Sequence, residues 1–370
     1  MEKLKNIAVV GVIALIIFGF SLAGIILPDK DFSISERRHL AKVPQISKIS
    51  DILQEDEEFA SEFESYGLDQ FPMREKLRTL KAAVSYYGMQ KTDNNGIYIE
   101  KGYASKLDYP LDDYSVSHAV ERVQYIYDSL IKGKTSRVYL SVIPDKNYFL
   151  AYEKGYPSID YNALTESVSR ELYFAEYIDI FPYLELEDYY KTDTHWKQEK
   201  ISNAAGYIAE SMGAGFEDEY EIKELACPFY GVYCGQAALP MRADTIKYID
   251  SPVFSKCRVF DYETNRETRL YDMEKAKGAD PYEMFLGGAK SLITIENPEA
   301  DDNRELIIFR DSFGSSLAPY FVSSYSKITI ADTRYIHPSV LKNYWSFDND
   351  NTDVLFIYST LLLNNSELMK

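Results

Sequence analysis

The stretch that decides the fold is 306–314, with the sequence Leu-Ile-Ile-Phe-Arg-Asp-Ser-Phe-Gly. Its first four residues are apolar and predict a buried strand, and a helical pattern follows over 315–325. A turn from strand to helix exposes Ser312 at the C-terminal edge of a sheet, where the following backbone N–H groups are able to hold an oxyanion. For this turn taken alone, a plain helix cap by Ser312 or Asp311 is an equally good interpretation.

Apolar strands alternate with helical patterns on both sides of this turn. The predicted strands are 137–143, 177–180, 327–331 and 354–358, and the predicted helices are 116–131, 163–176 and 194–212. This alternation indicates an α/β fold, with a parallel sheet that helices cover on both faces. Residues 222–303 mix short strands and turns.

A second motif, Asp193-Thr194-His195-Trp196, lies at the predicted start of helix 194–212, with Asp193 or Thr194 as its N-cap. A carboxylate two residues before a histidine is able to accept from the imidazole Nδ1–H, which leaves Nε2 free as a base. The competing interpretation is a cap followed by a surface histidine. Sites in open α/β sheets form at the carboxyl ends of strands. We therefore expect Asp193, His195 and Ser312 to converge as orienting acid, base and nucleophile.

The N-terminus predicts export. Residues 7–27 are apolar except for Ser21, and as a helix they are about 31 Å long, enough to cross a bilayer. Lys3 and Lys5 precede the stretch, and the next basic residue is Lys30, which places the N-terminus in the cytoplasm. A cleaved signal peptide is the alternative, because Ser21-Leu22-Ala23 resembles a cleavage site, but the continuing apolar run favours an uncleaved anchor.

The predicted organisation has three parts. They are a membrane anchor or signal sequence (1–27), a polar linker (28–50) and an extracytoplasmic domain (51–370). That domain begins with helical sequence over 52–87, which Pro72 interrupts.

Composition narrows the class of protein. The 370 residues carry a net charge of −18, and with 46% hydrophobic and 26% charged residues the chain is of an ordinary folding type. The acidic balance argues against a general nucleic-acid binder. Three cysteines (Cys227, Cys234 and Cys257) are too few for a disulfide scaffold and lack zinc-site spacing, so no metal is expected. A Cys227–Cys234 bridge and unpaired thiols remain alternatives. The 32 Tyr and 19 Phe suit sugar-stacking surfaces and aromatic cores alike.

Asp-x-His-Trp followed downstream by Asp-Ser-Phe resembles the SGNH-hydrolase-like proteins of cell-surface glycan O-acetylation, and more narrowly the DHHW family, relatives of the alginate O-acetylation proteins AlgX and AlgJ. The motif order is permuted relative to ordinary SGNH hydrolases, in which the serine comes first. Further similar segments are 35–40, 69–74, 94–96, 144–146, 282–288 and 332–335, so the resemblance spans roughly residue 30 to the end. The sequence departs from the pattern at Thr194, where the family name implies His, and at Arg310, where Gly is usual.

The resemblance implies an SGNH-hydrolase-like α/β fold and a membrane-anchored O-acetyltransferase or acetylesterase outside the cytoplasm. Ser312 would carry the acetyl group, with His195 as base and Asp193 orienting it. It implies no cofactor, a cell-surface or exopolysaccharide glycan as acceptor, and a membrane-bound O-acyltransferase as acetyl donor. The alternative is a non-catalytic glycan-binding or envelope-assembly protein that retains the fold.

Three further residues have expected roles near Ser312. The N–H of Gly314 would join that of Ser312 in stabilising the oxyanion. Arg334 would bind an acidic sugar or assist the oxyanion, or else form a surface salt bridge. Trp196 would stack on a sugar ring or pack behind His195.

Overall fold

The computed structural model describes residues 2–44, 57–134, 137–300, 302–344 and 351–370. They form two compact units. Unit 1 consists of Met1–Asn95 and Cys234–Pro240, and unit 2 consists of Gly96–Tyr233 and Met241–Lys370. The predicted boundaries at residues 27 and 50 stay predictions. Residues 45–56, which include the end of the predicted linker and the start of the predicted helix, lie outside the described residues.

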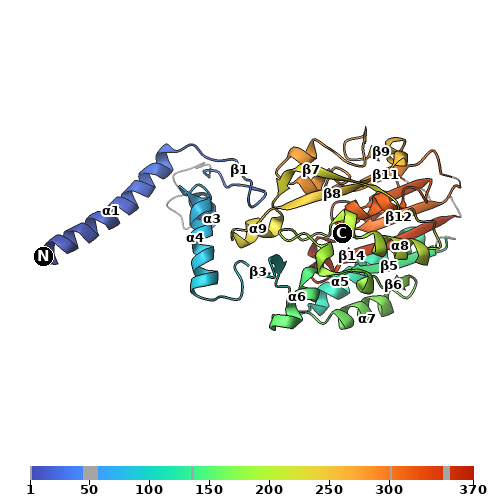
Figure 1. Cartoon of the computed structure of the whole chain (residues 1–370), viewed down its shortest axis with the longest axis horizontal. Coiled ribbons are helices and arrows are strands. Elements are labelled where there is room, and N and C mark those ends of the chain that lie inside the picture. Colours follow the sequence, from blue (N-terminus) through green and yellow to red (C-terminus); the bar gives the residue numbers. More distant parts are fainter. Residues whose placement is uncertain (1, 45–56, 135–136, 301, 345–350) are drawn as a thin grey trace. The chain divides into compact units, whose positions relative to one another are not determined.

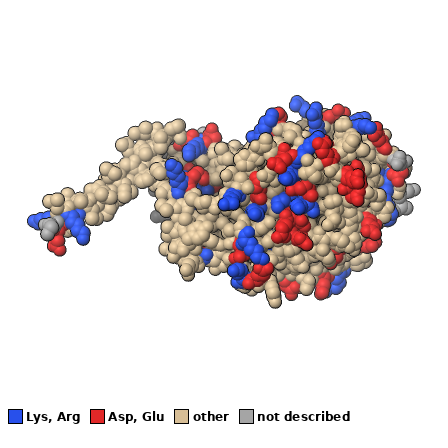
Figure 2. All heavy atoms as spheres, viewed as in Figure 1, with Lys and Arg blue, Asp and Glu red and all other residues tan. Residues whose placement is uncertain are grey.

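Unit 1 begins with the helix α1 (Glu2–Ile26), which Figure 1 shows in dark blue. It is long and apolar enough to cross a membrane, by length and composition. Figure 2 shows charged side chains at its start and none along its shaft. The helix therefore fits a single-pass membrane anchor or a signal sequence.

The rest of unit 1 is a small hairpin and two helices. Its elements are β1 (Phe32–Ser33), β2 (Arg38–His39), α3 (Glu57–Asp69), α4 (Arg74–Ala83) and the π-helical turn Val84–Gly88. The helical sequence breaks before α4 as predicted, because Pro72 lacks the N–H that a helix interior needs. Two hydrogen bonds of 2.7 and 2.6 Å join the Arg38 guanidinium to Asp69, and they hold the pKa of that carboxyl at about 2. The segment that precedes residue 45 is thus tied to α3.

Unit 2 is built on an eight-stranded sheet with the order β10-β9-β11-β13-β12-β14-β5-β6. Figure 1 labels β9, β11, β12, β14, β5 and β6 of this sheet. These strands are β5 (Arg137–Ile143), β6 (Glu176–Ile178), β9 (Arg258–Asp261), β10 (Arg266–Thr268), β11 (Leu292–Glu296), β12 (Glu305–Arg310), β13 (Lys327–Ala331) and β14 (Thr352–Ser359). Strands β13, β12, β14, β5 and β6 run parallel, as the sequence predicts. Strands β11, β9 and β10 extend the sheet antiparallel, which the mixed pattern of 222–303 does not predict.

Helices cover both faces of this sheet. Leu306 and Ile308 of β12 pack into one core with α8 (Ser202–Ser211), whereas Ile307 and Phe309 pack into a second core with α5 (Asp113–Ile126) and α7 (Tyr161–Glu171). Alternate residues of a strand point to opposite faces, so both sets must be apolar. Each such buried side chain contributes about 1.5–3 kcal/mol of transfer free energy.

Unit 2 also contains strands outside this sheet and further α-helices. They are β3 (Ile97–Glu100), β4 (Tyr103–Lys106), α6 (Lys146–Lys154), β7 (Glu221–Phe229), β8 (Asp244–Asp250), α10 (Gly314–Leu317), α11 (Pro338–Leu341) and α12 (Thr360–Leu363). The helix α9 (Val232–Ala237) begins in unit 2 and ends in unit 1.

Three predicted helices have different bounds in the structure. The helix expected over 194–212 begins only at Ser202, after a 3-10 turn at Gln198–Lys200. The helix expected over 315–325 is α10 followed by a 3-10 turn at Ala318–Phe321, because Pro319 cannot supply the N–H that an α-helix requires. Helix α7 ends at Glu171, earlier than the expected residue 176.

Candidate active site

Ser312 lies on the turn between β12 and α10, at the C-terminal end of the parallel strands. The carboxylate of Asp311 fixes this turn. One of its oxygens accepts from the N–H of Phe313 (3.0 Å) and the other from the N–H of Ser359 (2.8 Å), which ends the neighbouring strand β14. The serine turn is therefore attached to two adjacent strands.

Residues 190–195, which we name the Asp193 loop, form a tight reversal of the chain. The N–H of Tyr190 donates to the carbonyl of His195 (3.1 Å), and Tyr189 pairs with Trp196 in an isolated antiparallel bridge. The expectation that Asp193 or Thr194 caps a helix is wrong. The Asp193 carboxylate instead accepts from the N–H groups of His195 (3.1 Å) and Val232 (2.8 Å).

The Asp193 loop and the serine turn meet, as the sequence predicts. The Asp193 Oδ1 lies 2.5 Å from His195 Nδ1, and His195 Nε2 lies 2.7 Å from Ser312 Oγ. Asp193 is fully buried, and 9% of His195 is exposed. A carboxylate only accepts hydrogen bonds, so Nδ1 carries the proton shared with Asp193 and Nε2 is able to accept the serine proton.

Aromatic side chains hold the imidazole in place. The ring of Tyr282 stacks on His195 with centroids 3.9 Å apart and an interplanar angle of 10°. Burial raises the pKa of Tyr282 well above its usual value, so its hydroxyl stays neutral, at 2.9 Å from Ser316 Oγ. Trp196 is fully buried, and its Nε1–H donates to the same Ser316 oxygen (2.9 Å). Trp196 therefore packs behind His195, and the alternative that it stacks on a sugar is wrong.

Gly314 has a steric role next to the serine. Its N–H donates to the Asp311 carbonyl (3.1 Å), so this amide is engaged within the turn, in place of the oxyanion role expected for it. A Cβ at this position would lie 2.6 Å from Cβ and 2.8 Å from Cγ of Arg310. Gly314 therefore leaves room for the buried side chain of Arg310. Related motifs have glycine at the position of Arg310.

Arg310 and Arg334 share one carboxylate. The guanidinium of Arg310 donates to Asp332 (2.9 Å), and Arg334 donates to both oxygens of Asp332 (2.9 and 2.7 Å). Arg310 is 1% exposed and the Arg334 side chain 18% exposed. The salt-bridge interpretation of Arg334 is confirmed, but the pair is largely buried and does not lie at the surface.

Gly231 lets a neighbouring segment approach the Asp193 loop. A Cβ on Gly231 would lie 2.2 Å from Asp193 Cβ and 2.4 Å from its Cα, well inside contact distance. The N–H of Gly231 donates to Thr192 Oγ1 (2.8 Å), and Tyr233 donates to Thr194 Oγ1 (3.1 Å). Segment 231–233 therefore fixes three consecutive residues of the loop.

We expect Gly231→Ala to displace Asp193 and to lower the rate at which Ser312 reacts with an acylating reagent by about 10²-fold, because a misplacement of about 1 Å has that effect. The change also costs about 1–3 kcal/mol of unfolding free energy through overpacking. Gly215→Ala is the matched control, since the nearest atom to its added Cβ is Ser324 Oγ at 3.9 Å. Acylation kinetics and thermal melting test this, and an unchanged rate in Gly231→Ala would contradict the assigned contact.

Two residues that support the site, Asp244 and Tyr282, are not predicted by the acyl-transfer motifs in the sequence. Asp244 accepts from the N–H groups of Lys191 (3.0 Å) and Thr192 (2.7 Å) and from the Thr192 hydroxyl (2.7 Å). No motif surrounds Asp244. Tyr282 lies in a segment that supports the family resemblance, but nothing in that segment indicates contact with His195.

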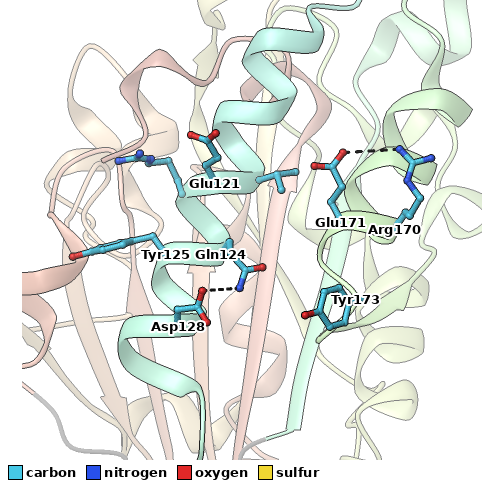
Figure 3. A pocket seen from close by; sticks show the side chains of 9 residues that line it. Glu121, Gln124, Tyr125, Asp128, Arg170, Glu171 and Tyr173 are labelled. Atoms are coloured by element: carbon cyan, nitrogen blue, oxygen red, sulfur yellow. Dashed lines mark hydrogen bonds and ion pairs between the residues drawn. The ribbon is translucent and has the colours of Figure 1, made fainter.

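Other candidate features lie apart from the triad residues. Cys227, Cys234 and Cys257 form no disulfide in the structure, so the alternative of a Cys227–Cys234 bridge is wrong. In the described part of the chain, no group of three or more His, Cys, Asp or Glu side chains is placed to hold a metal ion. A groove of about 690 Å³ between α5 and α7 (Figure 3) contains none of the triad residues. Its lining is Val120, Glu121, Arg122, Gln124, Tyr125, Asp128, Arg170, Glu171 and Tyr173.

Several solved structures have folds similar to that of this chain. A DHHW family protein from Eubacterium siraeum is similar at a TM-score of 0.61 and 21% identity, over 75% of this chain and 95% of that one. Bacillus cereus PatB1, solved with a sulfonyl adduct, is similar at a TM-score of 0.55 and 17% identity, over 72% of this chain and 95% of that one. The O-acetyltransferase domain of Pseudomonas putida AlgJ is similar at a TM-score of 0.45 and 12% identity, over 73% of this chain and 92% of that one. The resemblance to the DHHW family is therefore confirmed at the level of the fold.

Comparison with models of protein families gives no match, and comparison with the sequences of curated proteins gives none.

Proposed function

We propose that this chain is an extracytoplasmic, membrane-anchored serine acyltransferase that moves an acetyl group onto a glycan hydroxyl, or onto water. The observation that carries the proposal is the chain of hydrogen bonds from Asp193 through His195 to Ser312, at the C-terminal edge of the sheet. This is the arrangement of orienting acid, base and nucleophile that acyl transfer requires.

In the first half-reaction, Ser312 Oγ attacks the carbonyl carbon of an acetyl donor while His195 Nε2 takes its proton. Asp193 stabilises the resulting imidazolium through the Nδ1–H bond. The tetrahedral intermediate collapses, the donor's leaving group takes the proton from His195, and acetyl-Ser312 remains. In the second half, His195 removes the proton of an acceptor hydroxyl, whose oxygen attacks the acetyl carbon. As the ester bond to Ser312 breaks, His195 Nε2 returns that proton to Ser312 Oγ, which restores the free serine and neutral histidine.

Among the backbone amides at residues 312–314, the N–H of Ser312 is the proposed donor to the oxyanion. The two amides that follow it are engaged, since Phe313 donates to the Asp311 carboxylate and Gly314 to the Asp311 carbonyl. A donor of this kind is worth about 10²–10³-fold in rate. Arg334 is held by Asp332 and adds positive charge to this edge of the sheet.

The acceptor and donor are proposed by resemblance and chemistry. A cell-surface or secreted polysaccharide offers hydroxyls to acetyl-Ser312. The common acetyl carrier of the cytoplasm does not reach an exported domain, so a membrane-bound O-acyltransferase would pass the acetyl group outward. The apolar α1 would keep this chain beside such a partner.

The test uses the full-length chain in detergent with p-nitrophenyl acetate as donor. We expect release of p-nitrophenol, with acetyl transfer to an added deacetylated polysaccharide if the chain is a transferase and to water if it is an esterase. Mass analysis of the polysaccharide separates these outcomes. Folded protein that releases no p-nitrophenol would contradict the proposal and favour a glycan-binding or assembly role.

A further inference from the structure

Lys146 is a buried lysine that the proposed reaction does not use. It is 1% exposed, and it begins α6 directly after β5, where Asp145 caps the helix by accepting from the N–H of Asn147 (3.3 Å). A buried ammonium is costly unless its hydrogen bonds and charge are satisfied. The partners of Lys146 therefore indicate what it does.

Those partners belong to the Asp193 loop. The Lys146 Nζ donates to the carbonyl of Tyr190 (2.8 Å) and lies 3.4 Å from that of Lys191. It also lies 5.0 Å from the ring centroid of Tyr233, whose hydroxyl donates to Thr194. Lys146 thus bonds directly to Tyr190, the first residue of the Asp193 loop, and it is linked to Thr194 through the ring of Tyr233.

Three carboxylates and one ammonium act on Lys146. They are Asp193 in the loop, Asp244 on β8, Asp145 beside Lys146 and Lys197 just after the loop. Burial lowers the pKa of Lys146 from its usual 10.5 to about 7, while Asp193 and Asp244 oppose that change. The ammonium is therefore charged below about pH 7 and loses its charge above it.

We propose that the Lys146 ammonium positions the Asp193 loop and balances the charge of Asp193 and Asp244, so that the reactivity of Ser312 depends on whether Lys146 is protonated. The inference rests on the proposed function of Ser312. Without the positive charge, the carboxylates of Asp193 and Asp244, which both bond to the Asp193 loop, lose the ammonium that offsets their negative charge. Their repulsion then moves Asp193 away from the geometry that orients the imidazole.

The first test compares Lys146→Met with Lys154→Met, which removes an exposed lysine at the other end of α6 whose ammonium lies 3.9 Å from Glu100. The measured quantity is the rate of Ser312 acylation against pH in the full-length chain. We expect wild type and Lys154→Met to share an alkaline decline near pH 7. Lys146→Met is expected to be about 10²-fold slower at pH 6 and to lack that decline. A wild-type rate with no alkaline decline would overturn the proposal, whether or not Lys146→Met folds.

The second test is independent of acylation. The short Asp193–His195 hydrogen bond gives a low-field Nδ1–H proton resonance, which reports the loop geometry by NMR. We expect it in wild type and in Lys154→Met at pH 6, and its loss in folded Lys146→Met. If wild type is not acylated but this pattern holds, the proposed function fails and the positioning role stands. An unchanged resonance in Lys146→Met would overturn the positioning role.

Discussion

Ser312→Ala is expected to lower acetyl transfer from p-nitrophenyl acetate by about 10⁴–10⁶-fold, and to leave no covalent acetyl adduct. The reason is chemical, because alanine has no oxygen to attack the donor, and the residual rate comes from binding and the oxyanion donor alone. The fold should persist, since the substitution removes one hydroxyl whose partner is His195 Nε2.

The matched control is Ser255→Ala, which removes an exposed hydroxyl bound to the carbonyl of Pro252. It should keep the wild-type rate. Turnover and the circular dichroism spectrum are measured for both variants. A Ser312→Ala protein that retains wild-type turnover would exclude Ser312 as the nucleophile.

Asp193→Asn is expected to lower the same rate by about 10⁴-fold with the fold intact. In the structure both oxygens of Asp193 accept, one from His195 Nδ1–H and one from the N–H of Val232. A carboxamide offers one oxygen and one NH₂ group, so one of these contacts becomes donor against donor. If the amide turns its NH₂ toward Nδ1, the imidazole is held in the tautomer that cannot accept the serine proton.

Asp179→Asn is the control, because Asp179 accepts an exposed hydrogen bond from the N–H of Phe181. It should behave as wild type in the rate assay and in thermal melting. A rate for Asp193→Asn within a few-fold of wild type would show that Asp193 does not orient the base.

The sequence predicts the part of this site that local chemistry determines. A four-residue apolar strand before Ser312 requires burial on both faces, so its end must lie at the edge of a covered sheet. A carboxylate two residues from a histidine reaches Nδ1 by short-range geometry alone. These two facts, with the rule for strand ends, lead to the expectation that Asp193, His195 and Ser312 converge.

The supporting residues depend on contacts between distant parts of the chain. Gly231 matters only because its segment passes within van der Waals distance of Asp193, and no local pattern expresses that approach. Asp244 holds the Asp193 loop from across the fold, and so it has no nearby signature. The same long-range bonds explain why the helix predicted from Thr194 begins only at Ser202. Asp193 bonds to Val232, and the chain pairs Tyr189 with Trp196, before the helix starts.

The central claim is that Ser312 is a nucleophile activated by His195. The most direct test treats the full-length chain in detergent with a sulfonyl fluoride, which modifies activated serines, and maps the adduct by mass spectrometry of the intact chain and its peptides. The account predicts one adduct per chain, on the peptide that contains Ser312, and none in Ser312→Ala or His195→Ala. Folded wild-type protein with no adduct, or with an adduct that persists in both variants, would contradict it.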